Sequence, residues 1–280
     1  MSWAKVSCKG FKKFVCYDYT KILENILTSK KNPAKYAPCH DPNAPLESLE
    51  RECAKKAFRA KARKTLQKAQ DFQQSRFDTQ SARINKTLLN ILDSQKSRDF
   101  KARKFFLKEK KLQNVSKCKN ILLYAPFGFE ADIFRLIFTL RAKKKKIFIP
   151  YIQGISFKML PFRLPLQKNQ YGIYESTKSQ FNLTKIHIAV VPVLGIDRSF
   201  GRVGFGKGMY DRVFAAKKYT RKKQIPIIFV SRIPCVSAQI LSQPHDLKGD
   251  CLVSAAMWCK RAEYGNNIRS DRVYNLWDSR

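Results

Sequence analysis

Short apolar runs separated by longer mixed segments organise the C-terminal part of the chain. The runs occupy residues 121–124, 146–150, 186–191 and 225–230, and the segments between them have helix-like composition. Apolar runs without alternation are typical of strands buried on both faces, and such strands alternating with helices build a mainly parallel sheet. The pattern therefore predicts an α/β fold, a three-layer α/β/α sandwich with a mostly parallel sheet.

A different pattern precedes the sheet. Residues 54–113 contain almost no Gly or Pro and many Lys, Arg, Ala, Gln and Leu, which are good helix formers. Leu88, Ile91 and Leu92 recur at helical spacing within this region. We expect two or three basic helices here, covering one edge of a sheet core that begins at residue 120.

The first 53 residues combine aromatic residues and cysteines with the proline-broken stretch NPAKYAPCHDPNAP at 32–45, which suits neither a helix nor a strand interior. Only residues 14–27 are helix-like in this part. The chain is therefore predicted to divide into an N-terminal extension at 1–53, an α/β domain at 54–255 and a C-terminal tail at 256–280. We expect the extension to be a loosely packed, dispensable arm.

Basic residues dominate the charge, with 56 Lys and Arg against 21 Asp and Glu and a formal net charge of +35. Such a field concentrates anions, including nucleic acids, phosphates and polyglutamate. The basic excess extends over most of the chain rather than one element, which favours at most weak, non-specific nucleic-acid binding. The hydrophobic content of 44% excludes a wholly disordered protein.

Neither a membrane span nor a cysteine-based metal site is indicated. No apolar run approaches the ~18 residues needed to cross a bilayer, so we expect a soluble, cytoplasmic protein. The eight cysteines include no CxxC pair, which argues against a zinc ribbon or a thioredoxin-type redox motif.

A glycine-rich loop carries the strongest chemical signal. Gly201, Gly204, Gly206 and Gly208 follow a predicted buried strand and precede a helix-like segment. Glycines let a backbone approach an anion closely, and N–H groups at a helix start point toward phosphate. Lys207 adds a cation, and its distance from Gly201 fits the GxxxxGK spacing of a P-loop, but the Ser or Thr that follows in a P-loop is absent.

A nucleotide at this loop would bring magnesium, which requires an oxygen ligand. Asp211, at the start of the following helix, is the nearest candidate. The structural alternative is a glycine-rich turn with Asp211 as its helix cap.

The segment DRSFGRVGFGKGMYDR, at 197–212, resembles the signature of the 5-formyltetrahydrofolate cyclo-ligase family, also called methenyltetrahydrofolate synthetase. Met209 stands where that family usually has a Tyr, so an apolar wall remains but a ring and a hydroxyl are lost. Ser176 likewise stands where the family usually has Pro.

Further segments resemble the family's motifs in the same order along the chain. They are KKAFR at 55–59, YAPFGFEAD at 124–132, SFKML at 156–160, YGIYES at 171–176 and QPHDLKGDCLVS at 243–254. Each alone suits an ordinary role, such as solvated charge, core filling or a turn. Their joint order carries the resemblance.

The resemblance implies a NagB/RpiA/CoA-transferase-like sandwich that converts 5-formyltetrahydrofolate, with or without a polyglutamate tail, into 5,10-methenyltetrahydrofolate. ATP is the implied co-substrate and Mg²⁺ the implied cofactor, with ADP and phosphate released by a monomeric enzyme. A runner-up interpretation is a basic RNA- or ribosome-associated protein on a catalytically drifted domain of this kind.

The resemblance also implies roles for individual residues. The catalytic residues implied are Lys207, Arg202 and Glu130, and the metal ligands are Asp211 and Asp246. The substrate-binding residues implied are Ala125, Glu130, Met159, Tyr171, Phe205 and Met209. The ATP-binding residues implied are Lys55, Arg59, Arg202, Gly204, Phe205, Gly206, Lys207, Gly208, Met209 and Tyr210.

Overall fold

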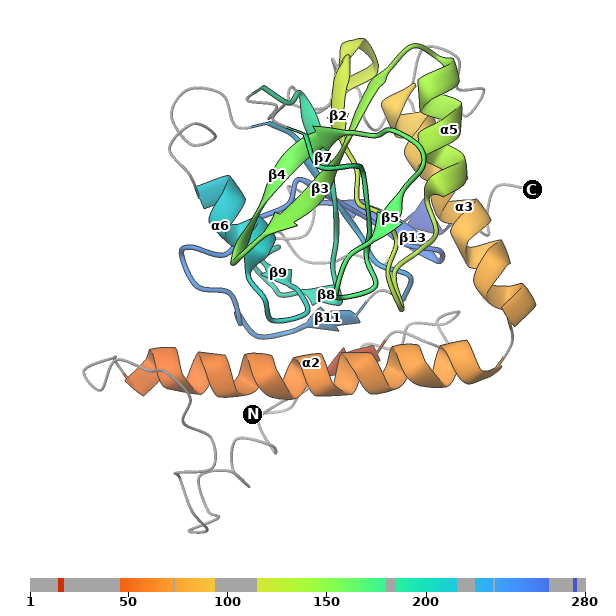
Figure 1. Ribbon diagram of the computed structural model, residues 1–280. Coiled ribbons are helices and arrows are strands. Elements are labelled where there is room, and N and C mark those ends of the chain that lie inside the picture. The colour runs from red at the N-terminus through yellow and green to blue at the C-terminus, as the bar shows by residue number, and fades with distance from the viewer. Residues whose placement is uncertain are drawn as a thin grey trace.

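An eight-stranded mixed sheet forms the centre of the protein in the computed structural model (Figure 1). The strand order is β14-β13-β12-β10-β7-β2-β3-β4. The structure describes residues 15–17, 46–72, 74–93, 115–179, 185–215, 225–233, 235–261 and 274–275.

The described helices and the short 3-10 turn have the following bounds: α2 Leu46–Phe72, α3 Gln74–Leu92, η3 Val115–Lys117, α5 Phe134–Ala142 and α6 Met209–Ala215. The described strands have these bounds: β1 Val15–Tyr17, β2 Asn120–Leu122, β3 Lys146–Gln153, β4 Ser156–Pro161, β5 Gln167–Lys168, β6 Tyr174–Glu175, β7 Ile188–Pro192, β8 Gly195–Ile196, β9 Arg202–Val203, β10 Ile227–Val230, β11 Cys235–Ser237, β12 Cys251–Val253, β13 Met257–Lys260 and β14 Tyr274–Asn275.

The four apolar runs of the sequence become neighbouring strands of this sheet. β3, β2, β7 and β10 pair in parallel in that order, and β12 continues the parallel part. Among the described strands of this sheet, antiparallel pairing is confined to the two edges, where β4 joins β3 and where β13 and β14 follow β12. The predicted mostly parallel α/β sheet is confirmed.

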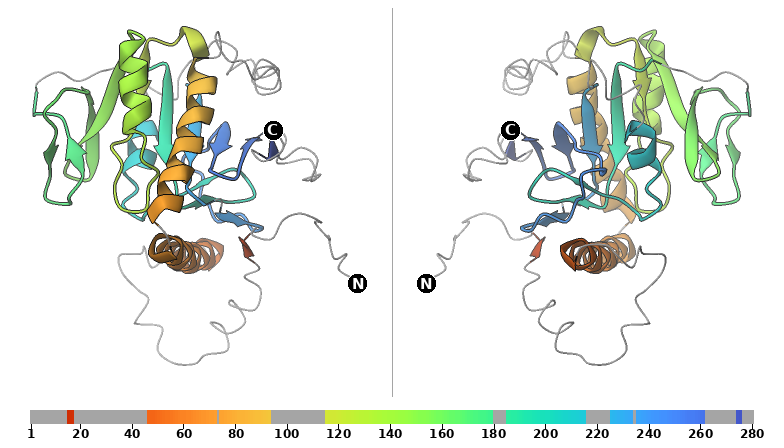
Figure 2. Two further views of the ribbon diagram at one scale, coloured as in Figure 1. Left: turned by 90° about the vertical axis from the view of Figure 1, so that its right-hand side faces the viewer. Right: turned by 90° about the vertical axis from the view of Figure 1, so that its left-hand side faces the viewer.

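Side chains of the central strands are buried on both faces because helices cover both. In β10, Ile228 and Val230 pack under α3 and α5, whereas Ile227 and Phe229 pack on the side of α6. Figure 2 shows α3 and α5 together on one side of the sheet and α6 on the other. This arrangement is the predicted three-layer sandwich.

The sequence predicted that the basic helices would cover one edge of the sheet. The two helices found there, α2 and α3, do not do so. α3 packs with α5 on one face through Ile84, Leu88, Ile91 and Leu92, since this stripe is apolar enough to be buried completely. α2 instead crosses one end of the molecule in Figure 1. The end of the predicted helical region, 94–113, lies outside the described residues.

α2 packs against a second, four-stranded sheet of order β1-β11-β8-β9. Ala54, Phe58, Ala62 and Leu66 recur every fourth residue and bury one stripe of the helix against Leu194, Val203, Cys235 and Leu241. This contact sets the distance between α2 and the glycine-rich loop, since that loop follows β9 directly.

Two predicted boundaries fall inside regular structure. α2 begins at Leu46, so the boundary after residue 53 lies within a helix, and β13 pairs with β12 across the boundary after residue 255. The expected helix at 14–27 is wrong at Val15–Tyr17, which form β1 and pair in parallel with β11. Most of the predicted extension and tail lies outside the described residues. Among the described helices, none has the length and apolarity to span a bilayer.

Candidate active site

Two pockets of about 370 Å³ each adjoin at the glycine-rich loop. One is lined mainly by charged residues and glycines, and the other mainly by apolar and aromatic residues. Arg202 and Gly208 line both, so the loop forms the partition between them.

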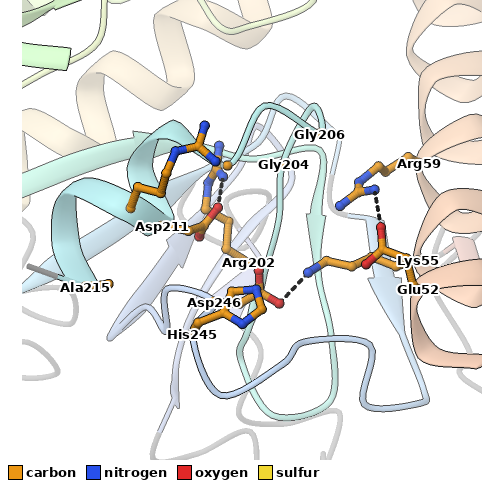
Figure 3. Close-up of a pocket in the computed structure, with 12 residues that line it drawn as sticks. Glu52, Lys55, Arg59, Arg202, Gly204, Gly206, Asp211, Ala215, His245 and Asp246 are labelled. Carbon is orange, nitrogen blue, oxygen red and sulfur yellow. Dashed lines mark hydrogen bonds and ion pairs between the residues drawn. The ribbon is translucent and has the colours of Figure 1, made fainter. Parts of the chain in front are cut away.

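The polar pocket lies between α2 and the loop. Lys55 and Arg59 extend from α2 toward the glycines, as Figure 3 shows. Lys55 Nζ forms an ion pair with Asp246, and Arg59 Nη1 lies 3.6 Å from Glu52 Oε1. The complete lining is Glu52, Lys55, Arg59, Arg202, Gly204, Gly206, Gly208, Asp211, Arg212, Ala215, His245 and Asp246.

Cationic side chains outnumber carboxylates in the polar pocket, and one of these cations has a hydrogen-bond donor without a described partner. Arg59 Nε is buried and has no hydrogen-bond partner among the residues that the structure describes. A buried donor without a partner is costly, so this nitrogen is suited to an anionic ligand. The pocket is therefore suited to an anionic group.

Glycine is required at particular points of the loop. Gly206 has φ of 107° and Gly208 has φ of 58°, a backbone conformation that other residues rarely adopt. At Gly204 a Cβ atom would lie 2.3 Å from Arg202 Nη1. The loop can thus present its backbone closely to a ligand while the arginine folds beneath it.

Arg202 is fixed from several directions. Its Nη1 donates to Asp211 Oδ2 at 3.1 Å, and its Nε and Nη2 donate to the carbonyl oxygen of Pro192 at 3.3 and 3.2 Å. Asp211 Oδ1 in turn accepts a hydrogen bond from the Leu247 amide at 3.0 Å. Arg202 is consequently a preorganised positive charge at the junction of the two pockets.

The two predicted metal ligands, Asp211 and Asp246, line the same pocket but differ in their free oxygens. Both oxygens of Asp211 already accept hydrogen bonds. In Asp246 only Oδ2 does so, from Lys55 and from the Gln243 amide at 2.7 Å, while Oδ1 has no partner in the described part of the chain.

No group of three or more His, Cys, Asp or Glu side chains suited to a metal occurs among the described residues. Mg²⁺ commonly binds through one or two carboxylates together with substrate phosphates and water. The donor set therefore fits Mg²⁺ carried in with a nucleotide, with Asp246 as the better ligand.

The apolar pocket contains one acidic side chain, Glu130. Its Oε2 accepts a hydrogen bond from the Phe127 amide at 3.0 Å. Burial raises the pKa of Glu130 to about 8, against smaller lowering effects of that hydrogen bond and of Arg202. Burial also raises the pKa of Tyr210 on the same wall. Glu130 is thus a carboxyl group poised to exchange a proton near neutral pH.

Two cations stand at the rim of the apolar pocket. Lys207 Nζ lies 3.3 Å from the centroid of the Tyr171 ring, and Arg63 Nη2 donates to the carbonyl oxygen of Phe205 at 2.7 Å. The complete lining is Arg63, Tyr124, Ala125, Phe127, Glu130, Pro150, Ile152, Phe157, Tyr171, Ile173, Pro192, Arg202, Phe205, Lys207, Gly208, Met209 and Tyr210.

The structure brings most of the predicted site residues together, although not always in the predicted pocket. The polar pocket contains the predicted ATP ligands Lys55, Arg59, Arg202, Gly204, Gly206 and Gly208. The apolar pocket contains the predicted substrate ligands Ala125, Glu130, Tyr171, Phe205 and Met209.

Lys207 and Tyr210, predicted beside the nucleotide, line the apolar pocket instead. Met159 lines neither pocket. It is 2% exposed and belongs to the core, directly opposite Pro150 of the pocket wall.

Three residues that the sequence analysis did not single out also shape the site. Arg63 continues the spacing of Lys55 and Arg59 along α2, so helical periodicity could have revealed it. Asp197 is completely buried and accepts hydrogen bonds from the amides of Gly201, Ser199, Leu241 and Ser242. Arg232 contacts the segment that carries Glu130, and no sequence signal marks it.

Comparison with known proteins assigns the chain to a family. The sequence model of the 5-formyltetrahydrofolate cyclo-ligase family matches residues 55–254, which include the whole lining of the apolar pocket and all of that of the polar pocket except Glu52. The chain belongs to the 5-formyltetrahydrofolate cyclo-ligase family.

Individual cyclo-ligases are similar to this chain at moderate identity. The 5-formyltetrahydrofolate cyclo-ligase of Haemophilus influenzae is 29% identical over 119 residues, which span 40% of this chain and 63% of the relative. The corresponding enzyme of Mycolicibacterium smegmatis is 25% identical over 142 residues, or 46% of this chain and 70% of the relative. The first of these matches thus covers less than two thirds of the relative's length.

A solved structure shows that the fold is shared. The 5,10-methenyltetrahydrofolate synthetase of Aquifex aeolicus, determined by NMR, superposes with a TM-score of 0.52 at 21% identity. The match covers 81% of this chain and 94% of that protein. The cyclo-ligase family match begins at Lys55, the first cation that α2 contributes to the polar pocket.

Proposed function

We propose that this protein converts 5-formyltetrahydrofolate into 5,10-methenyltetrahydrofolate, using MgATP and releasing ADP and phosphate. The observation that carries the proposal is the pair of adjoining pockets that share Arg202 and Gly208. One pocket suits phosphates and the other suits a flat heterocycle. Their common wall is where a phosphoryl group and a formyl oxygen would meet.

The reaction begins at the formyl oxygen of the substrate. This oxygen attacks the γ-phosphorus of ATP, an O–P bond forms, and the bond to the β-phosphate oxygen breaks to release ADP. Because such phosphoryl transfer requires mainly positioning and charge neutralisation, fixed cations supply most of the catalysis. Arg202 is held by the Pro192 carbonyl oxygen and by Asp211 and lines both pockets, so it would stabilise the transferred group without reorganising.

Lys55, Arg59 and the glycine backbone would hold the rest of the triphosphate. Arg59 Nε, buried without a partner among the described residues, would gain one. Bound Mg²⁺ would neutralise phosphate charge, and Asp246 Oδ1 is the oxygen that this chain offers it, with Asp211 held back by its hydrogen bonds to Arg202 and Leu247.

Ring closure then uses the apolar pocket. N10 of the folate attacks the activated formyl carbon, a C–N bond forms, the C–O bond to phosphate breaks, and N10 loses its proton. Glu130 is the carboxyl group of this pocket, and in its ionised form, which becomes the main form above its pKa of about 8, it would accept this proton and return it to solvent. The aromatic walls Phe127, Tyr171 and Phe205 would sandwich the heterocycle.

The cations at the rim of the apolar pocket suit a substrate that carries negative charge outside its ring system. Arg63 and Lys207 are exposed cations at this opening, so they suit the carboxylates of a glutamate or polyglutamate tail. The monomeric state and the cytoplasmic location that the sequence analysis expects stay predictions.

A direct assay tests the proposal. Purified protein is incubated with 5-formyltetrahydrofolate and MgATP, and the methenyl chromophore is followed by absorbance. We expect a product that depends on ATP and is lost in Arg202→Met. Matched reactions without ATP, or with an ATP analogue that cannot transfer its γ-phosphate, provide the controls. Absence of an ATP-dependent product in the wild-type protein would remove the assignment.

A further inference from the structure

Arg232 follows Ser231 after the end of β10 at Val230 and is only 5% exposed. Its guanidinium group reaches the segment that carries Glu130. Nη2 donates to the carbonyl oxygen of Glu130 at 2.6 Å, and Nε donates to that of Phe129 at 3.3 Å. Nη1 donates to Ser81 Oγ, on α3, at 3.1 Å. One side chain thus joins α3, the end of β10 and the wall of the apolar pocket.

The same segment is held at its next two residues. The hydroxyl of Tyr124 donates to the carbonyl oxygen of Ala131 at 2.8 Å. The amide of Asp132 donates to Ser81 Oγ, the atom that also accepts from Arg232, at 3.2 Å. Residues 129–132 are therefore attached to the surrounding structure at four consecutive positions.

This attachment determines where the Glu130 carboxyl group lies. The side chain has its own hydrogen bond from the Phe127 amide, but that donor belongs to the same short turn. The turn as a whole is located by contacts to other elements, and Arg232 supplies contacts at both Phe129 and Glu130. Removal of Arg232 would leave two partly buried carbonyl oxygens without these donors and free the turn to shift.

We propose that Arg232 is a positioning residue, which holds the backbone at Glu130 so that the Glu130 carboxyl group keeps its position in the apolar pocket. The effect of Arg232 on catalysis rests on the proposed function, whereas its anchoring of the backbone does not. Arg232 lines neither pocket, so it acts through Glu130 rather than by touching a substrate.

An arginine is suited to this position because its guanidinium group carries N–H donors that point in several directions. Burial lowers the pKa of Arg232 to about 10, with Tyr124, Asp132 and Asp78 opposing the shift, so the side chain remains charged at neutral pH. A lysine would keep the charge but has a single nitrogen, which cannot reach Ser81, Phe129 and Glu130 from the same points. This difference allows charge and geometry to be tested separately.

The test compares Arg232→Met and Arg232→Lys with Arg141→Met as the control. Arg141 is an exposed arginine of α5 that packs over Phe162, 5.3 Å from its ring centroid, and lines neither pocket. We expect Arg232→Met to lower kcat/KM for 5-formyltetrahydrofolate by about 10²-fold, the loss that a 1 Å misplacement produces. KM for ATP should change less than about twofold, because the polar pocket is untouched.

The pH profile and a substrate-free measurement complete the experiment. In Arg232→Met the turn is free to move and water reaches Glu130, which lowers the pKa of its carboxyl group. The limb of the pH–turnover profile near pH 8 should therefore move to lower pH in Arg232→Met, and by a smaller amount in Arg232→Lys. Amide hydrogen exchange of a peptide spanning residues 123–133 should become faster in both variants and stay unchanged in Arg141→Met.

The possible results are distinct. If the melting temperature falls while exchange in 123–133, the KM values and the pH profile all stay as in the wild type, Arg232 is only a stabilising residue and the inference is overturned. If the wild-type protein has no turnover but exchange still accelerates, the proposed function fails and the anchoring of the Glu130 turn stands. Should Arg232→Met not fold, Arg232→Lys provides the same comparison with a smaller effect.

Discussion

Arg202 and Asp211 form an ion pair, with 3.1 Å between Nη1 and Oδ2, that joins the strand before the glycine-rich loop to the helix after it. Both side chains are largely buried. The pair therefore holds the two ends of the loop together. The loop thus keeps a defined position although it contains glycines with positive φ. It also gives Asp211 a structural role beside the predicted metal role.

The two predicted metal ligands should respond differently to substitution. Asp211→Asn weakens a buried ion pair, so we expect a loss of about 2–4 kcal/mol in the free energy of unfolding. Asp246→Asn also weakens a buried ion pair, the one with Lys55, but it should in addition raise the Mg²⁺ concentration for half-maximal turnover by about tenfold or more. Denaturant unfolding and a Mg²⁺ titration of both variants measure this. Equal Mg²⁺ responses would contradict the distinction.

Glu130 should make stability depend on pH. Its pKa of about 8 in the folded protein lies above that of an exposed carboxyl group, because burial disfavours the charge. The folded state thus keeps a proton that the unfolded chain releases, and the free energy of unfolding falls as pH rises toward 8.

Glu130→Gln should therefore be more stable than the wild type at pH 9, with a much smaller difference at pH 5, although its turnover is lost. Urea unfolding at the two pH values gives the comparison. A wild-type curve that shows no such decline relative to Glu130→Gln would exclude a raised pKa.

Lys207 should contribute to substrate binding through its charge over Tyr171. We expect Lys207→Ala to lower kcat/KM for 5-formyltetrahydrofolate by about tenfold, mainly through a higher KM, because an exposed cation at the rim contacts the carboxylates of the substrate rather than its reacting atoms. Lys168→Ala is the matched control, since Lys168 Nζ lies 5.1 Å from the Tyr174 ring centroid but lines neither pocket. Steady-state kinetics should separate the two, and similar kcat/KM values in both would make the Lys207 contact structural.

The N-terminal region should be separable from catalysis. Deletion of residues 2–45 leaves α2 intact but removes β1, the parallel partner of β11, so we expect normal turnover with a melting temperature lower by about 2–4 °C. Arg59→Met in the full chain should instead raise KM for ATP without this loss of stability. A truncated protein with little turnover would show that the N-terminal region belongs to the working enzyme.

The charge of +35 should produce only weak RNA binding. Binding through scattered cations falls steeply with salt, with a log-log slope of about −0.9 for each neutralised phosphate of a duplex. We expect affinity for a structured RNA to vanish near physiological salt, with turnover unaffected by added RNA. Tight, salt-resistant binding in a fluorescence anisotropy titration would instead favour the RNA-associated interpretation.

Much of the fold could be predicted from local pattern. The runs at 121–124, 146–150, 186–191 and 225–230 are mostly apolar because their central residues are covered on both faces of the sheet, and they form neighbouring parallel strands. The glycine-rich loop could also be recognised from the sequence, since Gly206 and Gly208 have positive φ, a backbone conformation that favours glycine. These features depend on residues that are close in sequence.

Other features depend on contacts between distant segments, which no local pattern encodes. Asp246 meets Lys55 across 191 positions, and Arg232 meets Glu130 across 102. Likewise, Lys207 could be recognised as a cation of the loop, but the side of the loop it faces depends on where the hairpin carrying Tyr171 packs. The sequence supplied the chemical groups, and only the packing of α2, the loop and β10 decided which pocket each group serves.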